Sequence, residues 1–189
     1  IHFIKSIWKN IEAAMCWIDN YGDVDGDGFV EYQHKSVNGL TNQGWKDSHD
    51  SIMHADGTLA EPPIALCEVQ AYVYDAKKGA ARLASVLGHK EMADRWEKEA
   101  EELKQKFNEA FWNEELGIYV LALDGNKKPC CVVTSNAGHT LLGSIADSAK
   151  AKRIAQRLLK EDMFTGWGIR TLSRGEKRYN PMSYHNGSV

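Results

Sequence analysis

Apolar residues recur every three or four positions along the first 21 residues of the chain. That spacing is the period of an amphipathic helix, which is apolar on one face and polar on the other. The sequence therefore predicts a helix over Ile1–Tyr21. The recurring residues are Ile4, Trp8, Ile11, Met15 and Ile18.

A second apolar stripe runs through residues 66–87 and predicts another helix. Pro62-Pro63 precede this segment and Gly88 follows it, which are typical residues for the start and the end of a helix. The stripe consists of Leu66, Val69, Val73, Ala76, Ala80, Leu83 and Leu87. Three other side chains fall outside the stripe, namely Glu68, Tyr72 and Asp75.

The next segment, residues 92–111, repeats the helical spacing. Its outer positions carry a mixture of Glu and Lys, which suits a face turned to solvent. We therefore expect this helix to follow the previous one as a hairpin. Its inward residues are Met92, Trp96, Ala100, Leu103, Phe107 and Phe111.

Two β-prone runs, Ile118–Leu123 and Cys130–Thr134, flank a turn sequence at Asp124–Lys127. Apolar runs on both sides of such a turn predict a short β-hairpin. Two more helices are predicted after it. Asn136–Ala146 would be capped by Ser135, and Ala149–Glu161 would be capped by Ser148.

The connections alternate between short and long. Residues 22–63 and 164–189 form long polar stretches rich in Trp, Tyr, Asp and Asn, whereas the helices within each pair are joined by few residues. This alternation predicts antiparallel helical hairpins whose long loops gather at one end. The fold class is therefore mainly α, with one short β-hairpin.

Composition excludes several classes of protein. The chain has 189 residues, 23 of them Lys or Arg and 26 Asp or Glu, so its formal net charge is −3. A protein that binds phosphates needs a basic face, so nucleic acid is not an expected partner. No apolar run approaches the roughly 18 residues that span a bilayer, so we expect no membrane span.

The four cysteines show no spacing typical of a metal site. Cys16 and Cys67 lie in apolar helical stretches, and Cys130-Cys131 are adjacent. Free thiols of this kind behave as small core residues of a reduced protein. We therefore expect a cytoplasmic location.

An acidic turn follows the first predicted helix. Asp23, Asp25 and Asp27 alternate with other residues and precede Gly28. The favoured interpretation is a turn in which aspartate side chains accept hydrogen bonds from nearby backbone amides. The alternative is a calcium site like the start of an EF-hand loop, but the twelfth position is His34 rather than a bidentate Glu. No other cofactor is expected.

The segment Asn42–Ser51 is the first candidate for catalytic chemistry. Trp45 offers a flat apolar surface for a sugar ring, and polar side chains around it can bond hydroxyl groups. Asp47 and Asp50 are close enough in sequence to perturb each other, and like charges in a partly dry cleft raise one pKa, as a general acid requires. The alternative is a surface loop with a buried Trp anchor and an Asp cap.

Further candidates lie at the start of the second helix and in the last loop. Glu68 is either a site carboxylate or a favourable charge in a first helical turn. Trp167, Arg170 and His185 combine aromatic rings with hydrogen-bond donors, although simple packing is the alternative. Nucleotide-binding, serine-hydrolase and zincin motifs such as GxGxxG, GxSxG and HExxH are absent.

Several ordered strings together resemble the bacterial amylo-alpha-1,6-glucosidase, or glycogen debranching enzyme, family. They extend over nearly the whole chain, and the order of the set makes the resemblance specific. The strings are Asp25–Tyr32, Asn42–Ser48, Leu66–Tyr72, Ser135–His139, Gly166–Thr171 and Tyr179–Val189.

The resemblance implies part of an (α/α)6 toroid, built of six helical hairpins with an active-site funnel at one end. It also implies inverting hydrolysis of α-glucosidic linkages in an oligo- or polysaccharide, by one acid and one base. Asp47 in the Trp-X-Asp pattern would be the acid. Gln43, Trp45, Lys46 and Glu68 would line the sugar subsite.

The family pattern continues past Val189, where the resemblance implies the catalytic base. Since Ile1 already begins a helix and Asn186–Val189 shows no helix stop, we expect residues 1–189 to be one partial domain truncated at both ends. Exposed apolar helix edges would then favour self-association.

Two other classes of function stay open from the sequence. One is a sugar epimerase or isomerase on the same toroid, which would place histidine at the centre of the funnel. The other is a carbohydrate-binding module without catalysis.

Overall fold

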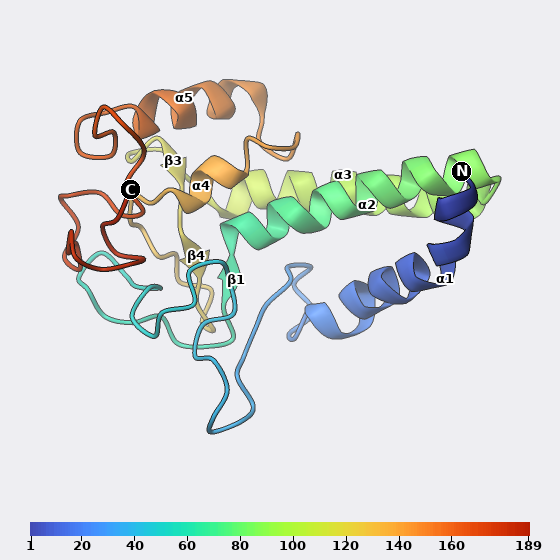
Figure 1. The fold of residues 1–189 in the computed structure, drawn as a ribbon, viewed down its shortest axis with the longest axis horizontal. Coiled ribbons are helices and arrows are strands. Elements are labelled where there is room, and N and C mark those ends of the chain that lie inside the picture. Colours follow the sequence, from blue (N-terminus) through green and yellow to red (C-terminus); the bar gives the residue numbers. More distant parts are fainter.

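A computed structural model describes residues 1–189, and the chain is mainly helical (Figure 1). The helices are α1 (His2–Trp17), α2 (Cys67–Leu87), α3 (Lys90–Ala110), α4 (Asn136–His139) and α5 (Ser148–Leu158), and a π-helical turn η1 (Ile18–Gly22) extends α1. The strands are β1 (Ala65–Leu66), β2 (Trp112–Asn113), β3 (Ile118–Tyr119) and β4 (Ala122–Leu123).

The centre of the fold is the antiparallel hairpin of α2 and α3, which confirms both helices predicted from the apolar stripes (Figure 1). Gly88 ends α2 with φ 86°, a left-handed conformation that glycine adopts without a Cβ clash. Phe107 and Phe111 stack in the core at 4.8 Å between ring centroids. Burial of such aromatic side chains supplies much of the stability of a small domain.

α2 is buried over a wider face than its apolar stripe predicts. Glu68 and Gln70 are fully buried, whereas Ala76 is exposed. The reason is that α2 contacts α1, α3 and α4, so that it is enclosed from several directions. Polar side chains are therefore drawn into the interior, where they must find hydrogen-bond partners.

The predicted β-hairpin is only partly present. A tight turn does form, because Cys130 N–H donates to the Ala122 carbonyl at 2.8 Å. However, β4 pairs with β1 and β3 pairs with β2, so the run Ile118–Leu123 serves two different partners. Short apolar runs have no intrinsic partner, since pairing depends on which strand edges the tertiary fold brings near.

The predicted helix Asn136–Ala146 was wrong in length, because α4 ends at His139. Gly143, which follows it, lies against Asp75 of α2. A Cβ at this glycine would stand 1.9 Å from the Asp75 carboxylate oxygen. The backbone therefore approaches α2 closely at Gly143, and the chain leaves the helical path before this residue.

The last predicted helix is confirmed with shifted bounds. It ends at Leu158 rather than at residue 161, and its N-cap residue is Asp147 rather than Ser148. Neither Asp147 here nor Ser135 before α4 makes a side-chain capping hydrogen bond. The start thus differs by one residue and the end by three, and helix ends are the least defined part of a helix because they fray.

The long loops meet at one end of the α2–α3 hairpin, opposite to the turn at Gly88 (Figure 1). Several hydrogen bonds connect the loops. Lys46 Nζ donates to the Thr171 carbonyl, and Asn186 Nδ2 donates to the Asp50 carbonyl at 3.2 Å. The predicted gathering of the loops is therefore confirmed.

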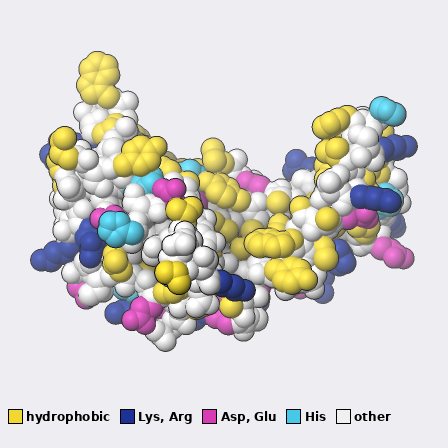
Figure 2. Space-filling view, turned by 60° about the horizontal axis from the view of Figure 1, so that its bottom comes forward, with side chains coloured by type: hydrophobic (Ala, Val, Ile, Leu, Met, Phe, Trp, Pro, Cys, Tyr) yellow, Lys and Arg dark blue, Asp and Glu magenta, His cyan; other side chains and the backbone are white.

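The helices are too short or too polar to cross a bilayer. All four cysteines are free. The segment α1–η1 exposes the large apolar side chains of Phe3, Trp17 and Tyr21. Figure 2 shows apolar side chains around the hollow in the middle of the molecule. Self-association through such a surface stays a prediction.

Candidate active site

The loop Asn42–Ser51 is held at both ends by buried hydrogen bonds. Tyr32 Oη donates to Asn42 Oδ1 at 2.7 Å, and Asn42 Nδ2 donates to the Ser48 carbonyl at 2.7 Å. Ser51 Oγ donates to the Lys46 carbonyl at 2.6 Å. These bonds fix the backbone of the segment between them, although it belongs to no helix or strand.

Exposure alternates along the middle of this loop. Trp45 is 40% exposed, Lys46 is 1% exposed, and the Asp47 side chain is 55% exposed. The buried Lys46 therefore anchors the loop, while its two neighbours face solvent. The predicted alternative of a buried Trp anchor does not hold, because the anchor is Lys46.

Trp45 belongs to an aromatic platform. Its ring stacks on His139 of α4 at 5.3 Å between centroids, with 29° between the planes. The His139 ring is in turn hydrogen-bonded through Nδ1 to the Tyr72 hydroxyl of α2. Burial lowers the pKa of His139, and the charge of Lys46 lowers it further. The platform thus combines flat apolar surfaces with a histidine that favours its neutral form.

His185 brings the C-terminal loop to the same place. Its Nδ1 accepts hydrogen bonds from Ser48 N–H at 3.2 Å and from Ser48 Oγ at 2.7 Å. An Nδ1 that accepts carries no proton. Burial also favours the neutral ring, because it lowers the pKa of His185, and the nearby Asp47 offsets part of that effect. The Asp47 carboxylate lies 3.8 Å from this Nδ1, beyond hydrogen-bond distance.

A polar layer lies beneath the platform. Glu68 is 0% exposed, and its Oε1 accepts a hydrogen bond from Asn136 Nδ2 at 2.9 Å. Burial raises the pKa of Glu68 and lowers the pKa of Lys46 to about 7. Both shifts favour the neutral forms, as expected for ionisable groups removed from water. Neither side chain is open to a sugar in this structure.

The structure does not gather all predicted site residues. Trp45, Lys46, Asp47, Glu68 and His185 lie together. Gln43 instead lines a cavity of about 330 Å³ beside Tyr32 and Leu66. Trp167 is 97% exposed in its own loop, and Arg170 Nη1 donates to the Glu161 carbonyl at 3.2 Å. No hydrogen bond or ring contact connects these three residues to Trp45.

Three residues of the site were missed as site residues in the sequence. Tyr72 lies one helical turn after Glu68 and outside the apolar stripe, which is a usable signal. Asn136 and His139 belong to a string that contributed to the family resemblance. Without the fold, however, nothing indicates that α4 lies against the loop that carries Trp45.

The acidic turn forms as the favoured interpretation predicted. Asp23 Oδ1 and Oδ2 accept hydrogen bonds from Gly26 N–H at 2.7 Å and from Gly28 N–H at 2.8 Å. Asp27 Oδ1 accepts from Phe29 N–H at 2.8 Å. Oxygen atoms of Asp23, Asp25 and Asp27 also lie within 4.8 Å of one another, which makes this group the candidate metal ligand set of the chain.

Gly44 provides a test of how tightly the site loop is packed. A Cβ at this position would stand 2.3 Å from Leu66 Cδ1 and 3.2 Å from Glu68 Oε1, both of which belong to fully buried residues. We expect Gly44→Ala to displace the loop and to reduce kcat/KM of the full-length protein on the order of 10-fold or more. Steady-state kinetics and thermal melts would measure both effects.

The matched control is Gly79→Ala in α2, where an added Cβ meets nothing within 4 Å. Alanine is favoured over glycine in a helix by about 0.5–1 kcal/mol, so this variant should melt at the same or a slightly higher temperature. Equal activity of the two variants would contradict the tight packing of Gly44.

The candidate site thus consists of an aromatic platform and the exposed Asp47 carboxylate, set where the long loops meet. The profile of the family described as mannosylglycerate hydrolase MGH1-like glycoside hydrolase domain matches residues 2–189. The chain therefore belongs to the MGH1-like glycoside hydrolase domain family. The predicted resemblance is thereby confirmed at the level of glycoside hydrolases, and not at the level of debranching enzymes.

Solved structures agree on the fold. A sialidase matches with a TM-score of 0.76 and 15% identity, over 100% of this chain and 16% of that one. The GH63 mannosylglycerate hydrolase from Thermus thermophilus, in complex with Tris, matches with a TM-score of 0.57 and 20% identity, over 67% and 30%. The neutral trehalase Nth1 from Saccharomyces cerevisiae matches with a TM-score of 0.57 and 14% identity, over 76% and 27%.

These structures are much longer than residues 1–189, which span less than a third of each. At such low identity they indicate a shared fold and say nothing about the substrate of this chain. A comparison with curated proteins finds no match.

Proposed function

We propose that this chain contributes the acid side of the active site of an inverting glycoside hydrolase, with Asp47 as the general acid. One observation carries this proposal: the Trp45 ring and the Asp47 carboxylate, which flank the buried Lys46 in the sequence, are both exposed. A sugar stacked on Trp45 would have its glycosidic oxygen within reach of the acid. Asp47 would protonate that oxygen as the bond to the anomeric carbon breaks.

The base of an inverting hydrolase stands about 6.5–9.5 Å from the acid and activates a water molecule. Glu68 is a poor base, because it is fully buried and its raised pKa favours the protonated carboxyl. We therefore assign the base to a part of the protein outside residues 1–189. The short coverage of the related hydrolases supports this assignment.

The remaining residues receive supporting roles. Trp45 bounds the sugar subsite, while the buried side chains of Lys46, Glu68 and His185 support it from beneath. Gln43, Trp167 and Arg170 would contact the substrate only after the rest of an (α/α)6 toroid is assembled around the loops. The α2–α3 pair is then one of its six hairpins, and residues 1–189 are part of one domain.

The substrate we propose is an α-glycoside, and two classes are open. The debranching resemblance favours an α-1,6-linked glucan, whereas the family name favours a small glycoside such as mannosylglycerate. The exposed platform suits a saccharide rather than a nucleic acid, given the net charge of −3. The free cysteines support a cytoplasmic location.

The test is to incubate the full-length protein with α-1,4-glucans, α-1,6-glucans, trehalose and mannosylglycerate, and to follow the products by proton NMR. An inverting enzyme should release the β-anomer first from an α-linked substrate, before mutarotation mixes the anomers. The substrate that is cleaved distinguishes the two classes.

Release of the α-anomer first would overturn the inverting mechanism. If no glycoside is cleaved but free sugars are epimerised, the isomerase alternative replaces the hydrolase. If glycosides bind and neither reaction occurs, a binding module remains.

A further inference from the structure

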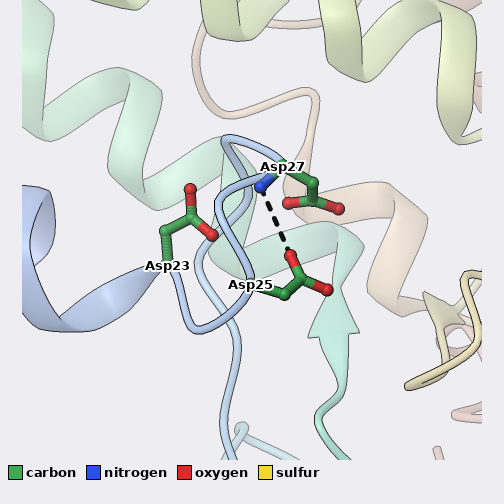
Figure 3. Close-up of side chains that lie close together, drawn as sticks. All are labelled: Asp23, Asp25 and Asp27. Atoms are coloured by element: carbon green, nitrogen blue, oxygen red, sulfur yellow. Dashed lines mark hydrogen bonds between the residues drawn. The ribbon is translucent and has the colours of Figure 1, made fainter.

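The acidic turn between η1 and Tyr32 has a second layer of contacts beyond its own backbone. Figure 3 shows Asp23 on one side of the turn and Asp25 with Asp27 on the other. Both oxygens of Asp23 are used by backbone amides of the turn. Asp25 and Asp27 each use Oδ1 in the same way, and each keeps Oδ2 for another partner.

That partner is Lys127, which lies far later in the chain, in the turn after β4. Its ammonium nitrogen lies 2.7 Å from Asp25 Oδ2 and 2.8 Å from Asp27 Oδ2. The same nitrogen donates to Glu31 Oε1. An ammonium group has three N–H bonds, so these three carboxylates use all its donors.

Glu31 is the buried member of this cluster. Its side chain is 0% exposed, Oε1 faces the ammonium, and Oε2 is buried without a hydrogen-bond partner. Burial raises the pKa of Glu31, while Lys127 lowers it in part. A buried carboxylate oxygen with no partner is rare in proteins, and it indicates unused capacity to bind a cation at this place.

Lys127 has an unusual backbone for a lysine. Its φ of 60° lies in the left-handed region, which Gly and Asn adopt with less strain. The turn itself is secured by Asp124, whose Oδ1 accepts hydrogen bonds from Asn126 N–H at 2.9 Å and from Lys128 N–H at 2.8 Å. Glycine would adopt this backbone conformation with less strain. The presence of a lysine here therefore indicates that its side chain is needed.

The charges explain that requirement. Asp23, Asp25, Asp27 and Glu31 would carry four negative charges within one turn, and Lys127 is the cation that contacts three of them. Burial lowers the pKa of Lys127, but its hydrogen bonds to the three carboxylates outweigh that effect and hold the pKa above its usual value. The group is thus a cation throughout the neutral range.

We propose that the Lys127 ammonium fills a cation site formed by Asp25, Asp27 and Glu31, and that its removal opens this site to a divalent cation, specifically calcium. Carboxylate oxygens are the ligands that calcium prefers, and the free Oε2 of Glu31 would supply a further one. The wild-type protein then requires no calcium at this turn. The ammonium also ties residues 25–31 to the turn 124–128, next to Tyr32 and Asn42, which position the site loop.

The test is Lys127→Gly in the full-length protein, with melting temperatures measured in EDTA and in about 10 mM calcium chloride. In EDTA the variant should melt at least several degrees below wild type, because the carboxylates lose their cation. Calcium should recover most of that loss, with a Kd on the order of 10⁻⁴–10⁻³ M. Wild type should show no calcium-dependent shift.

Lys128→Ala is the matched control, since it removes the same charge from the neighbouring position and should not respond to calcium. Glu31→Gln added to Lys127→Gly should abolish the response. If Lys127→Gly does not fold, Lys127→Gln, which removes the charge but keeps a polar side chain, is titrated with calcium by calorimetry. A calcium shift in wild type equal to that of the variant, or no calcium binding by either Lys127 variant, would overturn the proposal.

Discussion

Asp47→Asn should reduce hydrolysis by the full-length protein roughly 10²–10⁴-fold, which is the usual contribution of a positioned general acid. Asparagine keeps the size of the side chain but cannot transfer a proton. Since the Asp47 side chain is largely exposed and makes no hydrogen bond within the protein, the substitution should leave the melting temperature unchanged. The loss of rate would then reflect chemistry rather than folding.

The leaving group offers a sharper criterion. The fluoride ion of a glycosyl fluoride can leave without being protonated by an acid. Asp47→Asn should therefore lose much less activity on a glycosyl fluoride than on a natural glycoside. Asp50→Asn is the matched control. Asp50 contacts the C-terminal loop through its backbone carbonyl, and its side chain is not required for that bond. Equal losses on both substrates, or a larger loss in Asp50→Asn, would remove Asp47 from the role of acid.

Lys46→Met should change the pH dependence of stability above pH 7. Lys46 is 1% exposed, and burial lowers its pKa from 10.5 to about 7 in the folded protein. Between these two values the unfolded chain holds a proton that the folded protein has released. Stability therefore rises with pH in this window, by about 2–3 kcal/mol between pH 7 and pH 9.

Below pH 7 both states are protonated, so folding carries the full cost of burying the ammonium. Methionine removes that cost and fills a similar volume. The Thr171 carbonyl that accepts from Lys46 keeps Ser135 N–H as a donor at 3.3 Å. We therefore expect Lys46→Met to be at least as stable as wild type at pH 6, and to lack the rise above pH 7.

Denaturant unfolding at intervals from pH 6 to pH 9 measures this effect as the difference between the two curves. Glu68 acts in the opposite direction, because its pKa is raised and stability is lost as pH rises from 4.5 through its folded pKa. Subtracting the curves cancels most of that contribution. Parallel curves for wild type and Lys46→Met would show that the ammonium stays charged in the folded state.

The helices were the part of the fold that the sequence could predict well. The stripes of residues 66–87 and 92–111 specify α2 and α3 because helical periodicity and end signals such as Gly88 are local properties. The strands and α4 could not be predicted as well. Which segment pairs with Ile118–Tyr119, and that Gly143 must approach Asp75, depend on contacts between distant residues.

The candidate site shows the same division. The residue types of Trp45 and Asp47, and their place in a long polar loop, are visible in the sequence. That Lys46 between them is buried is not visible, because a lysine beside a tryptophan in a loop is normally expected at the surface. The partners that enclose it, Thr171 and Glu68, come from other segments.

By itself, the sequence determined the mainly helical class, the α2–α3 hairpin, the acidic turn and the resemblance to glycoside hydrolases. These features follow from spacing and residue chemistry within short segments. Only the tertiary structure decided that α4 and the C-terminal loop meet Trp45, that Lys127 lies among three carboxylates, and that Trp167 stands apart. Such contacts join residues tens of positions apart, and their energies exist only once the chain has folded.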